Sequence, residues 1–230
     1  MAKRPVFMVF NEKPFYKETI IDFEYFSGFA LSQKQKSIDS LHNAFLQDNI
    51  NKKVLEVSSK SKTDLGVQLS AFNLMIETKS KIKYSVESAF QSSKVFENGG
   101  PYTDLLFKES KEAKKDFRLK NSGKLKRFQY GERAFDLNPK TYFYNWLYIH
   151  ALDLNQDLVK RVINYDAFTD IEFNQNKSVN CQACAVAIYV SLFRNHLLNK
   201  ALENEKSFLE VVYGSNNDTD ITSYEQMSLL

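Results

Sequence analysis

The segment 84–98, "YSVESAFQSSKVFEN", spaces four polar side chains so that they would share one face of an α-helix. These residues are Glu87, Gln91, Lys94 and Asn98. At about 100° of rotation per residue they fall within an arc of about 60°. A carboxyl group and an amine can both move protons, and a neutral amine is also a nucleophile. The spacing therefore predicts the wall of a ligand cleft, and a helix-surface pair without a function is the alternative.

A second polar segment, "TDIEFNQNKSVNCQA" (169–183), leads into a long apolar stretch that we expect to be a helix. Its polar members of interest are Asp170, Glu172, Asn174, Asn180 and Gln182. The first turn of a helix offers free N–H groups and the positive end of the helix dipole, which together attract anions. The two segments alone therefore predict a cleft for a ligand that carries phosphates, and no more than that.

Composition indicates a helix-rich α+β protein. The chain has 230 residues, 43% hydrophobic and 26% charged, with 19 Phe and 12 Tyr but only 7 Gly and 4 Pro. Such a scarcity of turn formers argues against a β-sandwich. No run of 18 apolar residues and no signal-peptide pattern occurs, so we expect a cytoplasmic protein. Cys181 and Cys184 lack the partners of a zinc site, and we expect no metal.

Positive charge gathers in one segment, 111–128, although the whole chain carries a net charge of only +3. This segment holds eight Lys or Arg residues against Glu112 and Asp116, a local charge of +6. Such segregation is typical of a surface that meets phosphates. A solvated helix and loop that keep the protein soluble are the alternative.

The elements that must position these residues follow from periodicity and from the Gly and Pro positions. We find no repeat and no linker, so one continuous domain is expected. We predict strands at 5–10, 19–26 and 53–57; a helix at 37–47 with Ser37 as its N-cap; a strand pair around a turn at 79–80; a helix over 84–98; a helix pair within 139–165; and a central buried helix over 181–198.

Several motifs together resemble the NADAR family (NAD and ADP-ribose associated). The segment 84–96 matches its signature helix, a Val-Glu pair with Gln four and Lys seven residues after the Glu. "LSAFNL" (69–74) resembles its Ser-x-Phe segment and "SKEAKK" (110–115) its Ala-Lys step. Over about residues 1–210 the chain is most similar to the subfamily found beside DarT-type DNA ADP-ribosyltransferase toxins. After residue 165 it departs from the riboflavin-pathway glycosidases of the family, which argues against a riboflavin intermediate as substrate.

The resemblance implies a helix-dominated α+β fold like that of the riboflavin-intermediate N-glycosidases, with small sheets and a buried C-terminal helix. It implies an N-terminal extension (1–60), a catalytic core (61–213) and a frayed tail (214–230). The implied function is an antitoxin hydrolase that removes ADP-ribose from guanine bases in DNA. An N-glycosidase acting on a free nucleotide-like metabolite and a non-catalytic antitoxin that binds its toxin are the alternatives.

The resemblance also implies partners and ligands. The implied partners are ADP-ribosylated DNA and a DarT-type toxin, with no membrane, no cofactor beyond ADP-ribose as ligand and product, and a monomeric protein.

The same resemblance assigns roles to residues. It makes Lys94 the nucleophile that holds the opened ribose as a Schiff base, or alternatively an electrostatic partner, and Glu87 the general acid and base. Gln91 is expected to position the substrate. The other expected substrate contacts are Ser70 and Phe72 at the distal ribose, Trp146 stacked on a base, Asp170 and Glu172 at ribose hydroxyls or in proton transfer, and Asn174, Asn180 and Gln182 at the pyrophosphate or ribose. Core packing for Trp146, solvation for the acids and helix capping for the amides remain alternatives.

DNA must be held while the modified base enters the cleft. We expect sequence-independent phosphate contacts from two groups of basic residues. These residues are Lys34, Lys36, Lys60 and Lys62 in the N-terminal quarter, and Lys124, Lys126 and Arg127 in the basic segment. Phe26, Phe29 and Tyr102 are candidates for stacking on neighbouring bases, with core packing as the alternative.

Overall fold

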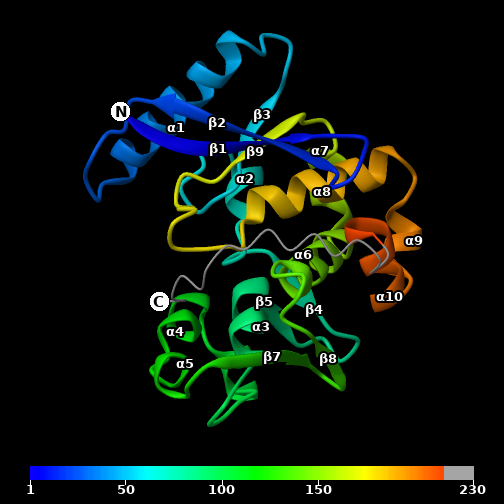
Figure 1. Ribbon diagram of the computed structural model, residues 1–230. Helices are drawn as coiled ribbons and strands as arrows, with labels where there is room; N and C mark the ends of the chain where they lie inside the picture. Colours follow the sequence, from blue (N-terminus) through cyan, green and yellow to red (C-terminus); the bar gives the residue numbers. More distant parts are fainter. Residues whose placement is uncertain (215–230) are drawn as a thin grey trace.

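A computed structural model describes residues 1–214 of the chain. Its upper part in Figure 1 is a four-stranded sheet of β1 (Ala2–Val9), β2 (Tyr16–Phe23), β3 (Val54–Glu56) and β9 (Ala167–Thr169), in the order β2-β1-β9-β3. β9 runs antiparallel to β1 and parallel to β3. A strand from late in the chain therefore joins a sheet built mainly from the first 60 residues.

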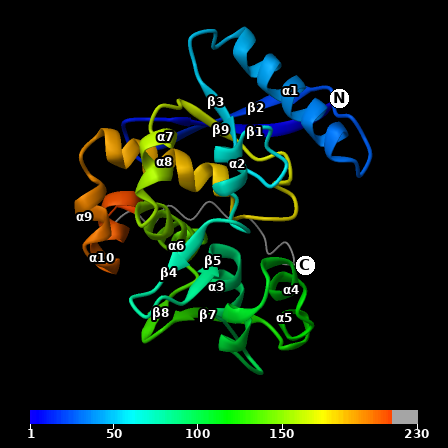
Figure 2. The same cartoon turned by 180° about the vertical axis from the view of Figure 1, so that it is seen from behind.

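The two faces of this sheet bury different helices because successive side chains of a strand point to opposite sides. Val6 of β1 joins a small apolar cluster under α1 (Leu31–Gln47), whereas its neighbour Phe7 belongs to the main core with α8 (Gln182–Arg194). Figures 1 and 2 show α1 and α8 on opposite faces of the sheet. α8 is apolar nearly all round, as the sequence predicts for a central helix.

The main core continues from α8 to α6 (Tyr142–Asp153), which is buried along almost its whole length. α7 (Gln156–Val162) follows it and forms the predicted helix pair. The remaining helices of this half are α2 (Asp64–Gln68), α9 (Leu198–Leu202), α10 (Glu205–Phe208) and a final turn, η2 (Leu209–Tyr213). Most of the buried aromatic residues belong to the main core, which also reaches into the other half of the molecule.

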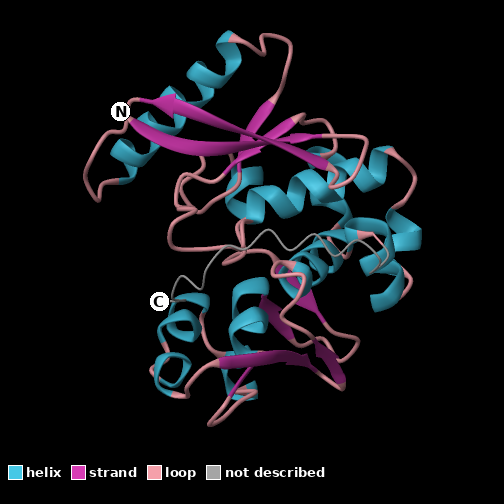
Figure 3. Ribbon diagram, viewed as in Figure 1, coloured by secondary structure: helices cyan, strands magenta, loops and turns pink. Residues whose placement is uncertain are grey.

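The lower part in Figure 3 combines short strands with short helices. β4 (Met75–Glu77) and β5 (Lys83–Ser85) form the predicted strand pair around residues 79–80. A second small sheet has the order β6 (Lys94–Phe96), β7 (Leu125–Tyr130), β8 (Arg133–Phe135). Helices α3 (Val86–Ser92), η1 (Thr103–Phe107), α4 (Ser110–Lys115) and α5 (Arg118–Asn121) cover it. Helices with small mixed sheets confirm the predicted α+β class.

Two predicted helix boundaries are wrong. α1 begins at Leu31, six residues before the predicted start, and Ser37 lies inside it. The hydroxyl of Ser37 accepts a hydrogen bond from the Phe26 N–H (2.9 Å), so it ties the preceding loop to the helix instead of capping the helix. The true N-cap, Ala30, has no side chain that could signal a helix start.

The helix predicted over 84–98 ends at Ser92. The hydroxyls of Ser92 and Ser93 both donate to the Ala89 carbonyl (2.9 and 2.7 Å), which is the local competition that weakens a helix interior. The chain then turns into β6, where Lys94 pairs with Phe128 of β7. The helical stripe thus includes Glu87 and Gln91, while Lys94 comes from a strand.

Within residues 1–214 no helix is both long enough and apolar enough to cross a bilayer. The predicted tail, 214–230, lies outside the described residues except for Gly214.

Candidate functional site

Glu87 lies in the first turn of α3 and is buried, with only 6% of the residue exposed to solvent. Ser85 caps this helix by accepting a hydrogen bond from the Ser88 N–H (3.0 Å). The Glu87 N–H itself donates to the Ala71 carbonyl (2.9 Å), so the segment before α3 fixes the helix start. The carboxyl group is therefore held by a short helix that is anchored at its first turn.

Lys94 brings an amine into the same region from β6. Its ammonium lies 5.0 Å from the centre of the Phe90 ring, on α3. The pKa of Lys94 is lowered to about 8. Burial is the largest cause, the Glu87 carboxylate acts in the opposite direction, and the positive charge of Lys114 adds to the lowering. Lys94 was predicted to lie on the same helix as Glu87. In the structure, β6 instead brings the Lys94 amine near the Glu87 carboxyl group.

Two further groups contact the Glu87 carboxylate. The Gln91 amide donates to Oε1 of Glu87 (2.9 Å), and Nζ of Lys114 lies 3.6 Å from the same oxygen. Gln91 Oε1 is buried and has no hydrogen-bond partner among the described residues. This oxygen is therefore an acceptor that the described residues leave without a donor, next to a carboxylate. Lys114 was missed as a site residue, and its only signal in the sequence was the Ala-Lys step of α4.

The segment 69–72 joins α3 to the polar segment before α8. The Ala71 N–H donates to Gln182 Oε1 (2.7 Å), and Gln182 Nε2 donates to Asp170 Oδ2 (3.0 Å). Ala71 thus binds Glu87 through its carbonyl and Gln182 through its N–H. Both polar ends of the Gln182 side chain are engaged by the protein, so Gln182 positions the segment beside Glu87. Ser70 is buried and Phe72 is half-buried next to it.

A pair of buried carboxyl groups stands behind this segment. Glu56, which the sequence did not single out, accepts hydrogen bonds from Ser58 (2.6 Å), Thr169 (2.6 Å) and the Ile171 N–H (2.9 Å). Burial raises the pKa of Glu56, and burial followed by the charge of Glu56 raises the pKa of Asp170 to about 8. The raised pKa favours the protonated form of Asp170.

Tyr144 of α6 lies between the two groups of acids. Its ring packs edge-on against Phe90, with the ring centres 5.2 Å apart. Burial raises the pKa of Tyr144, and the charges of Glu87 and Asp170 raise it further. The phenol is thus near enough to both carboxyl groups for their charges to act on it, and the sequence did not single it out.

The sequence comparison decides the family. A family model described as DarT1-associated NADAR antitoxin matches residues 2–221. The chain belongs to this family of NADAR antitoxins. Its members are antitoxins whose functional partner is a toxin of the DarT1 type. The comparison with curated proteins returns no match.

Three other predicted contacts of the NADAR antitoxin make no hydrogen bond to Glu87 within residues 1–214 and differ in their surroundings. Trp146 is 3% exposed and packs between Phe135 and His150, with ring centres 4.8 and 4.1 Å away, so it belongs to the aromatic core and has no free face for a base. Asn174 accepts the Asn176 N–H (3.0 Å) in a turn. Asn180 is half-buried, and its Oδ1 has no hydrogen-bond partner within residues 1–214.

Some of the predicted DNA-binding residues are held in ion pairs. Lys34 lies 3.1 Å from Glu172, Lys126 lies 2.8 Å from Glu97, and Lys62 pairs with Asp39. Lys60 is half-buried. The basic residues Lys36, Lys124 and Arg127 are exposed, as is Phe29.

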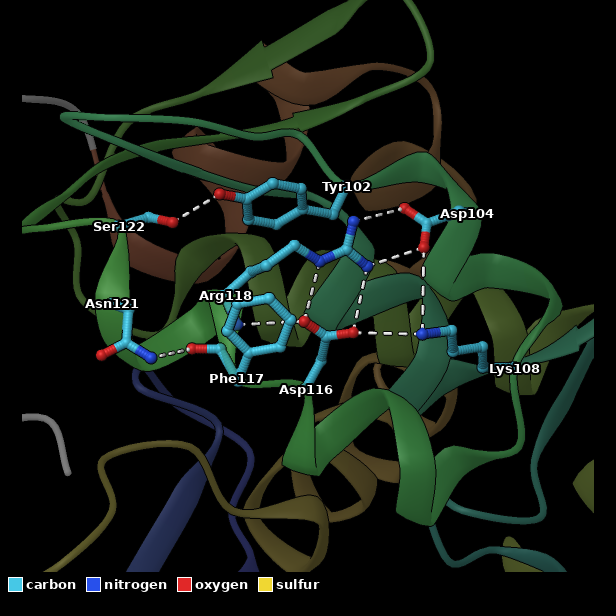
Figure 4. Close-up of polar contacts among 8 residues, drawn as sticks. All are labelled: Tyr102, Asp104, Lys108, Asp116, Phe117, Arg118, Asn121 and Ser122. Atoms are coloured by element: carbon cyan, nitrogen blue, oxygen red, sulfur yellow. Dashed lines mark hydrogen bonds and ion pairs between the residues drawn. The ribbon is translucent and has the colours of Figure 1, made fainter.

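Arg118 of the basic segment serves the fold. Its guanidinium binds Asp104 (2.6 and 3.1 Å) and Asp116 (2.8 and 3.0 Å) and lies 4.5 Å from the centre of the Tyr102 ring. Figure 4 shows this cluster, in which Lys108 also reaches Asp116 (3.1 Å). Hydrogen bonds from Arg118 hold the pKa of Asp116 well below its usual range. The cluster connects η1 to the ends of α4 and α5.

The raised pKa of Asp170 gives a stability prediction. Since the folded state binds this proton up to pH about 8 and an unfolded Asp releases it near pH 4, folding is favoured at low pH. This stabilisation is lost as the pH rises from about 4 to about 8. Asp170→Asn removes the titration. Its free energy of unfolding, measured by urea unfolding, should therefore change less between pH 5 and pH 9 than that of the wild type, by on the order of 1–3 kcal/mol.

The exposed Asp136 provides a matched control for this measurement. Asp136→Asn should follow the wild-type pH dependence. Equal pH dependence in Asp170→Asn and the wild type would contradict a protonated Asp170.

Proposed function

We propose that this antitoxin is a hydrolase that releases ADP-ribose from guanine bases in DNA by cleaving the bond between the ribose C1″ and the exocyclic amine. The observation that carries the proposal is that the buried Glu87 carboxyl group lies near enough for its charge to act on the Lys94 amine, whose pKa is about 8. At pH 7.5 roughly a quarter of such an amine is neutral, against about a thousandth at the ordinary lysine value. A neutral amine can attack an electrophilic carbon.

The bond to be broken is a glycosylamine, which fits these two groups. Protonation of the ribose ring oxygen opens the sugar and leaves C1″ joined to the base nitrogen as an iminium ion. The Lys94 amine adds to C1″, a proton moves from the Lys94 nitrogen to the base nitrogen, and guanine leaves with its amine restored. Water then adds to the Lys94 Schiff base, and its collapse returns the free amine and ADP-ribose. The net reaction consumes one water molecule.

Glu87 is suited to carry the protons in these steps. As a carboxylic acid it can protonate the ring oxygen, and as a carboxylate it can take a proton from the attacking water. The Gln91 amide, which donates to Oε1 of Glu87, orients the carboxyl group. Its free carbonyl oxygen is placed for a hydrogen bond from a sugar hydroxyl or a base N–H.

Toxin-modified DNA is the decisive substrate. Incubation of DNA carrying ADP-ribosylated guanine with the protein should release ADP-ribose and leave unmodified guanine, both measurable by mass spectrometry of the digested DNA. Protection of cells without release of ADP-ribose would instead favour a non-catalytic antitoxin. Equal rates on ADP-ribosylated guanosine and on DNA would favour a free metabolite as substrate.

Binding of the DNA backbone leads to a separate prediction. Arg127 lies on β7, beside the strand that carries Lys94, and Lys124 directly precedes β7. Lys36 lies on α1, whose Lys34 contacts Glu172. Replacing Lys36, Lys124 and Arg127 together by alanine should lower kcat/KM on modified DNA about tenfold near 100 mM salt. The slope of log kcat/KM against log salt concentration should also become shallower, by the amount expected for the loss of up to about three phosphate contacts.

The nucleoside substrate is the control for this variant, because it has no DNA backbone. Its turnover should be unchanged by the triple replacement. A loss of equal size on the nucleoside would mean that these residues act on the site itself and not on the DNA.

A further inference from the structure

The helix that carries Lys114 is held in place at both ends. α4 has six residues, fewer than an isolated helix needs to be stable. At its start, the Ser110 hydroxyl bonds to the Phe72 carbonyl (2.8 Å) and to the Ser85 hydroxyl (2.7 Å). At its end, Asp116 is bound by Arg118 and Lys108 (Figure 4). Between them, Ala113 is fully buried and α4 packs against α3.

This anchoring directs one side chain at the candidate site. Lys114 is about half-exposed, yet its Nζ lies 3.6 Å from Glu87 Oε1 and 5.1 Å from the centre of the Phe72 ring. The side chain of an exposed lysine ordinarily keeps its ammonium in water. Here the fold places a second amine next to the carboxyl group that the proposed chemistry uses.

The Glu87 carboxylate is thereby satisfied without Lys94. Gln91 and Lys114 both contact its Oε1, and within residues 1–214 Lys94 makes no ion pair. The Lys94 amine lies over the ring of Phe90 from α3, and this ring packs in turn against Tyr144 of α6 and Phe128 of β7. Apart from Glu87, Lys114 is therefore the charged side chain that acts on Lys94 among the described residues.

We propose that Lys114 is a positioning residue of this site, whose ammonium occupies Glu87 and disfavours a second positive charge, so that the amine of Lys94 stays neutral and nucleophilic. The proposal rests on the proposed function for the use of that amine. Physically, two ammonium groups compete for one carboxylate, which is itself buried. Lys114 holds the carboxylate, so among the described residues the ammonium of Lys94 lacks an ion-pair partner and is repelled by Lys114. Both effects favour release of the proton from Lys94.

The titration of Lys94 can be measured without substrate or partner. In protein labelled with ¹³C-lysine, the Cε resonance of Lys94 can be assigned by its loss in Lys94→Arg and followed from pH 6 to pH 11. The wild-type amine should titrate near pH 8. In Lys114→Met, which keeps the length of the side chain and removes its charge, the titration should move up by about one pH unit.

Two variants serve as controls. Lys114→Arg retains the charge and should restore a titration close to that of the wild type. Lys115→Met removes a positive charge from the next, exposed position of the same helix and should leave Lys94 unaffected. The proposal is overturned if Lys94 titrates at the same pH in Lys114→Met and the wild type, or near pH 10.5 in the wild type.

Turnover on modified DNA gives a second measurement. Lys114→Met should be about tenfold slower than the wild type at pH 7.5, with the deficit closing above pH 9.5 as Lys94 loses its proton in both proteins. A rise in KM that is equal at every pH would instead make Lys114 a ligand of the substrate phosphates and would overturn the proposal. If even the wild type releases no ADP-ribose, the proposed function fails, but the titration still decides the role of Lys114.

Discussion

Lys94→Met is expected to abolish the release of ADP-ribose from modified DNA, with a loss of at least about a thousandfold in kcat. The variant keeps an apolar stem against Phe90 but has no amine to form the bond to C1″. In the wild type, borohydride added during turnover should reduce the Schiff base to a stable secondary amine. Peptide mapping should then find ADP-ribose on Lys94 alone.

The outcomes of this experiment separate two mechanisms. Normal turnover by Lys94→Met, or an adduct on another lysine, would exclude Lys94 as the nucleophile. An inactive variant together with a wild type that cannot be trapped would leave direct hydrolysis by water, with Lys94 as an electrostatic partner. Lys111→Met, an exposed change on α4, is the control for charge and should keep its activity.

Glu87→Gln is expected to slow turnover by roughly 10²–10⁴-fold, the range usual for loss of a general acid or base. The amide has the shape of the carboxyl group and can still accept hydrogen bonds from Gln91 and Lys114. The loss should therefore fall on kcat and leave KM nearly unchanged. Single-turnover kinetics with modified DNA in the two proteins would separate binding from the chemical steps.

A matched control exists on the neighbouring helix. Glu112 is an exposed carboxylate of α4, and Glu112→Gln should behave as the wild type. Thermal unfolding of both variants shows whether the fold is intact. A Glu87→Gln protein that is stable and fully active would remove Glu87 from the chemistry and leave it as a buried partner of Lys114.

Much of the architecture could be predicted from short-range patterns. Apolar segments at 5–10 and 19–26 predicted β1 and β2, whose observed bounds begin three residues earlier. A turn at 79–80 predicted the strand pair around it, and continuous apolar character predicted the buried helix α8. These features depend on neighbours along the chain. The errors at the boundaries of α1 and α3 involve serine hydroxyl groups that bond to the backbone. Ser37 accepts a hydrogen bond from the Phe26 N–H, and Ser92 and Ser93 donate to the Ala89 carbonyl. Periodicity does not register such bonds.

The candidate site was predictable in its chemistry but only partly in its membership. Glu87 and Lys94 were chosen on a helical spacing that does not exist beyond Ser92, and the family motif carried the choice. Glu56, Lys114 and Tyr144 were missed because each reaches the site from a separate element. Trp146 was a candidate for stacking by residue type, and the packing of α6 against β8 encloses it instead.

The sequence by itself determined the family, the α+β class and the residue types of an acid and an amine, because a motif and a hydrophobic period are written along the chain. Only the tertiary structure decided how these groups are arranged. The link from Glu87 through Ala71 to Gln182 includes a hydrogen bond between residues 111 positions apart, and the pairing of β6 with β7 places Lys94 near Glu87. The protonation of Lys94 and Asp170 likewise depends on burial and on charges from distant segments, which a linear spacing does not contain.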